Sequence, residues 1–225
     1  MLHLTADDHA FASGPVFQRP GNLLRAWKMT HSLPAGRQLQ RLWQQFETRA
    51  ALGEGLRLGL RARLVNKDLR QTVRIGDNVV CRGILRNERG GRLDIGDRVY
   101  IGDGVLLSSA CHIVLGDGVM LAHGVQIFDN DSHPIDAAER ERHFRMILGL
   151  EKPSAVNIGK SPVTIGSRVW IGTQSIVTKG VTIGPDTVVA AGSVVVKDLP
   201  AGVLAAGNPA RVLRDFKEVY HDQVA

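Results

Sequence analysis

Large aliphatic residues recur every six positions over most of the second half of the chain. They form four triples: Ile95, Ile101 and Leu107; Leu115, Leu121 and Ile127; Ile165, Ile171 and Val177; Ile183, Val189 and Val195. A period of six fits neither the 3.6-residue repeat of a helix nor the alternation of a long strand. It is typical of a coil of short parallel strands that turns a corner every six residues, so that three corners complete one turn of a prism. The pattern predicts an all-β solenoid.

The residues around each aliphatic position support the same interpretation. The next residue is usually glycine or alanine, as at Gly96, Gly102 and Ala122, and the residue four positions on is usually Val or another small side chain. A small residue permits a tight turn, while the backbone N–H and C=O groups of each coil can pair with the coils above and below. An ordinary sandwich with glycine turns would not keep a fixed six-residue step.

The repeat stops between Ser132 and about Pro162. A polar and partly basic stretch replaces it, including residues 136–145. A loop longer than about 12–15 residues in a regular scaffold is usually functional or disordered. We therefore expect residues 134–162 to form a protruding active-site loop.

A helical pattern precedes the repeat. Apolar residues at helical spacing are Leu39, Leu42, Trp43, Phe46 and Ala50, which predicts an amphipathic helix ending near Gly53. We expect a small N-terminal helical segment over residues 1–70, a β-helix over 71–214 whose first coil starts near Val73, and a C-terminal tail over 215–225. The start of that tail, residues 215–220, could form a short helix.

Composition adds to this picture. Of the 225 residues 44% are hydrophobic but only 5% aromatic, and 25 are glycine, so the core must consist of many small and β-branched side chains. Cys81 and Cys111 have neither the spacing of a metal or redox site nor the density of a disulfide-rich secreted domain. The first eight residues lack the basic and apolar regions expected of a signal peptide, and no apolar run reaches the length of about 18 residues that a membrane-spanning helix needs. We expect a cytoplasmic protein.

The net charge of +6 comes from the N-terminal segment. Residues 1–72 hold 11 Lys and Arg against 5 Asp and Glu, whereas residues 73–225 hold 17 of each. Basic residues interleaved with aromatics, which would indicate nucleic-acid binding, are missing. We expect no nucleic-acid partner. Three interpretations of the basic segment 1–72 stay open: it binds an anionic small molecule, it associates peripherally with an anionic membrane surface, or it is a solvated basic helix.

Four motifs, in this order, resemble the galactoside and maltose O-acetyltransferases and, more broadly, the polysaccharide O-acetyltransferases of the hexapeptide-repeat class. They are Phe128–Ile135, Pro162–Gly172, Ala191–Asp198 and Gly207–Arg214, and the resemblance covers about residues 73–214. It implies a left-handed parallel β-helix, an exception to the usual right-handed crossover. It also implies a homotrimer with active sites between neighbouring chains, acetyl-CoA as acyl donor and a saccharide acceptor.

Transfer of an acetyl group from a thioester to an alcohol needs a base that removes the hydroxyl proton, and histidine titrates in the right range. His133 matches the family's His-Pro step at the foot of the long loop, which makes it the candidate catalytic base. His112 and His123 lie on the repeat and stay open as site residues. The other five histidines are interpreted as surface or packing residues: His3, His9, His31, His143 and His221.

Candidate substrate-side residues lie next to His133 and on a preceding coil. Asp129, Asn130 and Asp131 directly precede His133 and could orient its imidazole, but a turn-forming cluster explains them equally well. Asp103 stands near the position where related galactoside enzymes carry an asparagine on a preceding coil.

For the donor, the resemblance implies a tryptophan beside the thioester, residues along the pantetheine arm, and cations near the adenosine 3′-phosphate. The matching residues are, in that order, Trp170; Thr173 and Ala191; Lys197, Arg211 and Arg214. No metal is expected, because the spaced histidine triad of the β-helical carbonic anhydrases is missing.

The sequence thus predicts an acetyl-CoA-dependent O-acetyltransferase acting on a sugar, oligosaccharide or surface-polysaccharide precursor. Two alternatives remain open: an N-acyltransferase acting on a nucleotide-linked amino sugar, and a non-catalytic β-helical scaffold. The His-Pro step and the C-terminal motif argue against the first. A scaffold would have no reason to keep His133, Trp170, Lys197 and Arg211 together.

Overall fold

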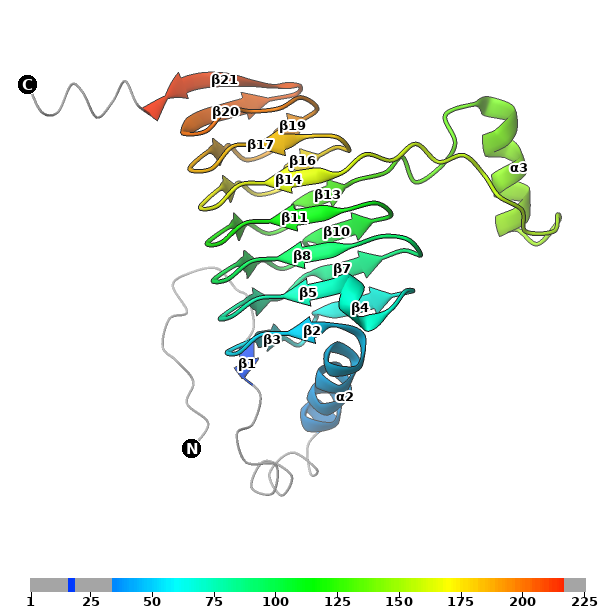
Figure 1. The fold of residues 1–225 in the computed structure, drawn as a ribbon, viewed down its shortest axis with the longest axis horizontal. Coiled ribbons are helices and arrows are strands. Elements are labelled where there is room, and N and C mark those ends of the chain that lie inside the picture. The colour runs from blue at the N-terminus through cyan, green and yellow to red at the C-terminus, as the bar shows by residue number, and fades with distance from the viewer. Residues whose placement is uncertain (1–15, 19–33, 217–225) are drawn as a thin grey trace, which may run out of the picture.

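The chain winds into a left-handed parallel β-helix, as predicted, and each coil adds one strand to each of three sheets (Figure 1). The computed structural model describes residues 16–18 and 34–216. Sheet B contains β2 (Ala51–Leu52), β5 (Val73–Ile75), β8 (Leu93–Ile95), β11 (Ile113–Leu115), β14 (Val163–Ile165) and β17 (Thr182–Ile183). Sheet A contains β1 (Val16–Gln18), β3 (Arg57–Gly59), β6 (Val80–Cys81), β9 (Tyr100–Ile101), β12 (Met120–Leu121), β15 (Trp170–Ile171), β18 (Val188–Val189), β20 (Val203–Gly207) and β21 (Ala210–Asp215). Sheet C contains β4 (Arg63–Asn66), β7 (Ile84–Asn87), β10 (Leu106–Ser109), β13 (Gln126–Phe128), β16 (Ile176–Val177) and β19 (Val194–Val195).

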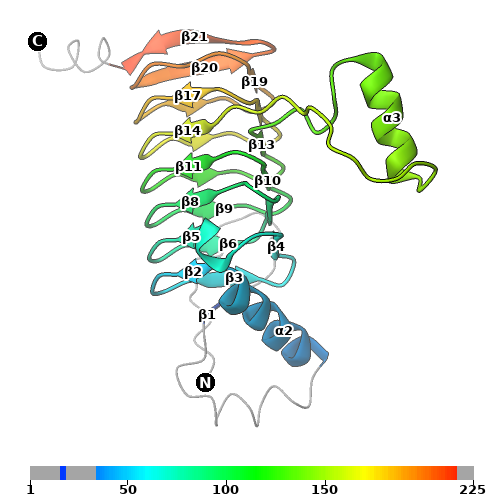
Figure 2. The same cartoon turned by 45° about the vertical axis from the view of Figure 1, so that its right-hand side comes forward.

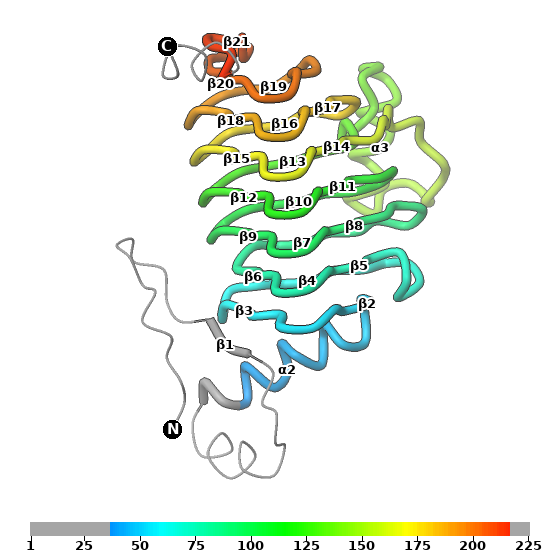
Figure 3. Tube along the Cα trace, turned by 60° about the vertical axis from the view of Figure 1, so that its left-hand side comes forward, coloured from blue at the N-terminus to red at the C-terminus, as the bar shows by residue number. Residues whose placement is uncertain are grey.

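In every coil the chain passes from sheet B to sheet A and then to sheet C, so the prism has three corners. Figure 3 shows sheets A and C as adjoining columns of stacked strands. We call the turn between sheets A and C the AC corner, with residues 102–105, 122–125, 172–175 and 190–193 in successive coils. We call the turn from sheet C to the next coil's sheet B the CB corner, with residues 110–112, 178–181 and 196–199 in three of the coils and the long loop at 129–162.

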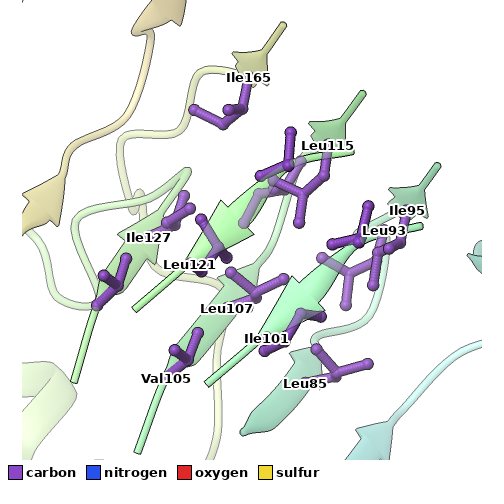
Figure 4. Close-up of a cluster of buried hydrophobic side chains, with 14 of the residues drawn as sticks. Leu85, Leu93, Ile95, Ile101, Val105, Leu107, Leu115, Leu121, Ile127 and Ile165 are labelled. Carbon is purple, nitrogen blue, oxygen red and sulfur yellow. The ribbon is translucent and has the colours of Figure 1, made fainter. Parts of the chain in front are cut away.

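The six-residue aliphatic repeat forms the core. Leu115 pairs with Ile165, Leu121 with Ile171, and Ile127 with Val177, so equivalent residues stack from coil to coil. Their side chains point into the prism and are fully buried (Figure 4). Truncating one such side chain to alanine would cost about 2–5 kcal/mol of stability.

The small residue after each aliphatic position is required by the close stacking of corners. A Cβ added to Gly172 would lie 2.5 Å from the backbone nitrogen of Ala191 in the next coil. Because backbone atoms cannot move aside as a flexible side chain can, only a residue of minimal size fits there.

Helix α2 (Pro34–Arg49) covers the N-terminal end of the prism, and its apolar face, including Trp43 and Phe46, is buried. The predicted helix is therefore present and ends at Arg49. The expected start of the first coil near Val73 is wrong, because β2, β3 and β4 already form a coil from Ala51. Leu52, Leu58 and Leu64 continue the six-residue spacing.

The break in the repeat is a projecting arm between β13 and β14 (Figures 1 and 2). It contains a helix that the sequence pattern did not predict, α3 (Ala137–Ile147). Asp136 begins this helix, since its carboxylate accepts a hydrogen bond from the backbone N–H of Glu139 at 2.9 Å. No residue of α3 is buried, so the arm does not contribute to the core.

At the C-terminal end, β20 and β21 pair in antiparallel fashion instead of forming a further coil. The helix considered for residues 215–220 lies mostly outside the described residues. The same holds for much of the basic segment 1–72, because residues 1–15 and 19–33 are not described. Neither α2 nor α3 has the length and apolar character needed to cross a membrane.

Candidate active site

The arm leaves and rejoins the prism at the CB corner, where its two ends pair with each other. The backbone N–H of Asp131 donates to the carbonyl of Gly159, and that of Ser161 donates to the carbonyl of Asp129, both at 2.9 Å. We call these two paired stretches, residues 129–133 and 159–161, the loop foot. His133 lies at its outer end.

Asp129 stabilises the corner below the foot. Its carboxylate is fully buried and accepts hydrogen bonds from the Ser109 hydroxyl at 2.7 Å and from the backbone N–H groups of Ala110 and Cys111 at 2.7 and 2.9 Å. Asn130 donates to the Ser108 carbonyl at 3.1 Å. These contacts hold the chain in place and none of them involves the imidazole of His133, so the turn-forming interpretation fits these two side chains.

Asp131 fixes the foot to the next coil. Both of its oxygens contact Nζ of Lys179, at 2.7 and 2.8 Å, and the two side chains are only 21% and 31% exposed. The carbonyl of Asp131 accepts a hydrogen bond from the backbone N–H of His133 at 2.6 Å. Lys179 thus restrains the backbone beneath the candidate base. Lys179 was not among the residues predicted from the sequence, because nothing in the six-residue repeat distinguishes it from any other corner residue.

His133 is exposed, and its imidazole contacts a second imidazole on the arm. Its Nδ1 lies 3.3 Å from Nδ1 of His143 in α3, with the ring centroids 5.2 Å apart and the ring planes tilted by 52°. The sequence predicted only a surface or packing role for His143. No sequence signal linked the two, since the contact depends on how the arm folds back between them.

Of the two other histidines kept open by the sequence, His112 lies at the CB corner one coil before the loop foot, and its carbonyl accepts the backbone N–H of Val163 at 2.9 Å. Nε2 of His112 lies 2.8 Å from Asp94, which also contacts Arg92 at 2.6 Å. Partial burial would raise the pKa of Asp94, but the hydrogen bonds from Arg92 and His112 outweigh it and hold that pKa below its ordinary value. His123 lies at the AC corner.

The residues proposed for the donor's thioester and pantetheine arm gather along sheet A and the AC corner. Trp170 stands on the outer face of β15 with half of its side chain exposed, in register between Met120 and Val188. Thr173 and Ala191 occupy neighbouring coils of the adjoining AC corner. The carbonyl of Thr173 accepts the backbone N–H of Gly192 at 2.8 Å.

The two arginines lie further along the same sheet. Val188 pairs with Leu204, and Leu204 pairs with Arg214 on β21, which places Arg214 three strands above Trp170. At ~4.8 Å per strand this is a separation of ~14 Å. Arg211 is on the same strand, and both arginine side chains are exposed. Lys197 is also exposed but lies at the CB corner, one coil above Lys179.

Asp103 lies at the AC corner in an earlier coil. It forms an ion pair with Arg82 at 2.8 Å, and the Arg82 side chain is only 6% exposed. Within residues 34–216, no group of three or more His, Cys, Asp or Glu side chains is arranged to hold a metal ion.

The prism thus presents two sets of candidate residues on different sides. His133 and Lys197 belong to the CB corner, whereas Trp170, Thr173, Ala191, Arg211 and Arg214 belong to sheet A and the AC corner. Sheet A is the face opposite the CB corner, and the arm projects away from it (Figures 1 and 2). The described chain does not bring His133 and Trp170 to one point.

Comparison with known proteins identifies relatives with matching repeats. The family model for the bacterial transferase hexapeptide (six repeats) matches residues 162–197. A provisionally named colanic acid biosynthesis acetyltransferase of Escherichia coli is 34% identical over 149 residues, which cover 64% of this chain and 70% of the relative. The galactoside O-acetyltransferase of E. coli is 51% identical over 57 residues, covering 25% and 28% of the two chains. A provisionally named acetyltransferase of Saccharomyces cerevisiae is 37% identical over 142 residues, which span 63% of this chain and 65% of the relative.

Solved structures share the fold at lower identity. A galactoside acetyltransferase in complex with coenzyme A superposes with a TM-score of 0.54 at 23% identity, covering 92% of this chain and 90% of that chain. An N-acyltransferase from Bacillus cereus in complex with dTDP and 3-hydroxybutyryl-CoA gives 0.61 at 19% identity, covering 83% and 94%. The identity and coverage of the colanic acid relative of E. coli, together with the match to the family model, show that the chain belongs to the hexapeptide-repeat family of acetyltransferases.

Proposed function

We propose that this protein transfers the acetyl group of acetyl-CoA to a hydroxyl group of a saccharide, with His133 as the general base. The observation that carries the proposal is the exposed imidazole of His133 on a foot that Lys179 and Asp131 clamp to the prism. The acceptor class follows from the galactoside and colanic acid relatives.

The chemistry needs one well-placed base. His133 accepts the proton of the acceptor hydroxyl as the oxygen attacks the thioester carbonyl, a new C–O bond forms, and a tetrahedral intermediate results. When this intermediate collapses, the C–S bond breaks and the protonated imidazole returns the proton to the leaving thiolate. A base of this kind typically contributes about 10²–10⁴-fold to the rate.

The side of the prism that carries Trp170 has the properties that coenzyme A requires. Trp170 and Met120, each about half exposed, provide an apolar surface beside the AC corner. Thr173 and Ala191 have small side chains at that corner, which suits a narrow, amide-containing arm, and Arg211 and Arg214 supply exposed cations for phosphate at the far end. In this arrangement the phosphates bind ~14 Å from Trp170, along the axis of the prism.

We infer that the complete site is shared between chains of a homotrimer. His133 lies on the foot of the arm at the CB corner, while Trp170 lies on sheet A opposite that corner, so the base of one chain would meet the donor site of its neighbour. Closed symmetry then gives three identical sites per trimer.

Acetyl-CoA turnover, followed by release of free thiol, tests the proposal against a panel of mono-, di- and lipid-linked saccharides. His133→Ala should lower kcat by about 10²–10⁴-fold while leaving the affinity for acetyl-CoA nearly unchanged, because the base acts on the acceptor proton. Arg214→Ala should weaken coenzyme A binding with little effect on saturated turnover, because a phosphate contact helps ground and transition states alike. Near-normal turnover by His133→Ala would contradict the assignment of the base.

An amine acceptor is the second candidate. A 2,3,4,5-tetrahydropyridine-2,6-dicarboxylate N-acetyltransferase of Clostridium perfringens is 46% identical over 74 residues, although these cover only 29% of that relative. Including amino sugars in the acceptor panel decides between the two: preferential acetylation of the amine would replace the saccharide-hydroxyl assignment.

A further inference from the structure

We propose that His143 is a positioning residue for His133. It holds the His133 imidazole in the tautomer that carries its proton on Nδ1, so that the lone pair of Nε2 is available to the acceptor hydroxyl. The inference rests on the proposed role of His133 as the base and adds a second residue, from the arm, to the same site.

The contact between the rings restricts where the protons are. Two Nδ1 atoms 3.3 Å apart can form a hydrogen bond only if one carries hydrogen and the other presents a lone pair. If His133 donates, its Nε2 has a free lone pair and can accept a proton. If His143 donates, the proton of neutral His133 resides on Nε2, and that nitrogen cannot act as a base. Only the first arrangement is productive.

The productive arrangement also persists through the reaction. When His133 takes up a proton at Nε2 it becomes an imidazolium, and its Nδ1–H continues to donate to the neutral ring of His143. The acceptor on His143 therefore stabilises the charge that develops on the base. The carboxylate of a Ser-His-Asp triad supports its histidine in the same way, by fixing tautomer and orientation.

Both rings are attached to restrained backbone, which makes the contact more than a chance approach of two surface side chains. On the His133 side, the backbone N–H donates to Asp131, which Lys179 anchors to the next coil. On the His143 side, Asp136 caps the first turn of α3.

A further link joins the two sides directly. The guanidinium of Arg140, one helical turn before His143, donates to the carbonyls of Pro134 at 3.2 Å and Ile135 at 2.6 Å. These are the two residues that follow His133. Arg140 therefore fixes the start of α3 against the foot, and the separation of the two rings is set by backbone contacts rather than by the rings alone.

Two substitutions at position 143 distinguish the effect of the hydrogen-bond acceptor from the effect of the size of the side chain. His143→Phe keeps a ring of similar shape but has no acceptor, and His143→Asn places a carbonyl oxygen close to the position of the imidazole Nδ1. His143→Phe should lower kcat about three- to tenfold, the effect expected for loss of one hydrogen bond, with an unchanged KM for acetyl-CoA. His143→Asn should recover most of that loss.

The tautomer itself is the decisive readout. Imidazole ¹⁵N and ¹³C NMR on the full-length protein, with the His133 signals assigned by their disappearance in His133→Gln, should show the proton on Nδ1 in the unmodified protein. In His143→Phe the signals should shift toward the Nε2–H form. A residue that only supports the shape of the arm would not move this equilibrium when the ring is kept.

The inference fails if His133 already carries its proton on Nε2 in the unmodified protein, or if His143→Phe changes neither the tautomer nor kcat. These outcomes are distinct from failure of the proposed function. If His133→Ala is inactive while His143→Phe is normal, the base stands and only the positioning role is lost. If His133→Ala stays active, the assignment of the base is wrong, and the NMR measurement still reports whether His143 fixes the tautomer.

Discussion

At the scale of single residues, the motif Phe128–Ile135 contains both a residue that stabilises the fold and the candidate catalytic base. Asp129 and His133 are four residues apart, yet one carboxylate is fully buried in a corner and the imidazole is exposed on the arm. Burial of a carboxylate is costly unless its oxygens accept hydrogen bonds, and the corner N–H groups of Ala110 and Cys111 meet this need. A charged residue next to a catalytic candidate can thus serve the fold alone.

The clamp between Lys179 and Asp131 gives a residue-scale prediction. Lys179→Met should destabilise the protein by about 1–2 kcal/mol, because it leaves a partly buried carboxylate without its counter-ion, and the loosened foot should lower kcat. Urea unfolding and turnover measure the two effects.

Lys67→Met is the matched control for this clamp. Lys67 also forms an ion pair, with Glu88 at 2.7 Å, but its side chain is 57% exposed. An exposed pair of this kind contributes at most about 1 kcal/mol, so its removal should have little effect on stability and none on kcat. Equal effects of the two substitutions would show that the foot does not depend on Lys179.

At the scale of elements, α3 differs from every strand of the prism. Its residues are not buried, so its stability comes from local contacts such as the Asp136 cap and not from the core. The arm can therefore loosen without unfolding the β-helix. This independence matters for function, because α3 carries the partner of the candidate base.

Asp136→Ala should weaken α3 by about 1 kcal/mol, the usual cost of losing an N-cap. Amide hydrogen exchange over residues 137–147 should become roughly fivefold faster, with the melting temperature of the prism unchanged. Asp136→Ser, which keeps a capping oxygen, should stay close to the unmodified protein. A substantial drop in the global melting temperature would contradict the independence of the arm.

At the scale of the whole molecule, the placement of His133 and Trp170 on opposite sides of the prism predicts that the protein assembles as a trimer. Sedimentation should give a species of three times 24.4 kDa. If each site takes His133 from one chain and Trp170 from its neighbour, trimers assembled at random from equal amounts of His133→Ala and Trp170→Ala chains should contain roughly one intact site in four.

Co-expression of these two differently tagged variants, each of low activity alone, provides the measurement. Recovery of activity in the purified mixed trimers would support the shared site. Mixed trimers as inactive as either parent would mean that one chain supplies both residues, and a monomer at micromolar concentration would remove the shared site altogether.

The sequence by itself determined the prism, the helix that covers its end and the position of the arm. It could do so because a solenoid is built from contacts between neighbouring coils, so each coil repeats the same local pattern of burial and the period of six is visible without knowledge of the rest. The first coil of the prism, with Leu52, Leu58 and Leu64, has the same six-residue spacing but was not predicted. Arginines surround these leucines in the sequence, and the helical pattern ends next to them.

Only the tertiary structure decided how the candidate site is built. Lys179 and Asp131 are 48 residues apart, and His133 meets His143 only because the arm folds back on itself. It also decided that His133 and Trp170 lie on different sides of the prism. None of these relations repeats from coil to coil, so no periodic pattern could reveal them. They depend on the direction in which an irregular segment leaves a regular scaffold, which is set by individual hydrogen bonds and ion pairs rather than by the spacing of hydrophobic residues.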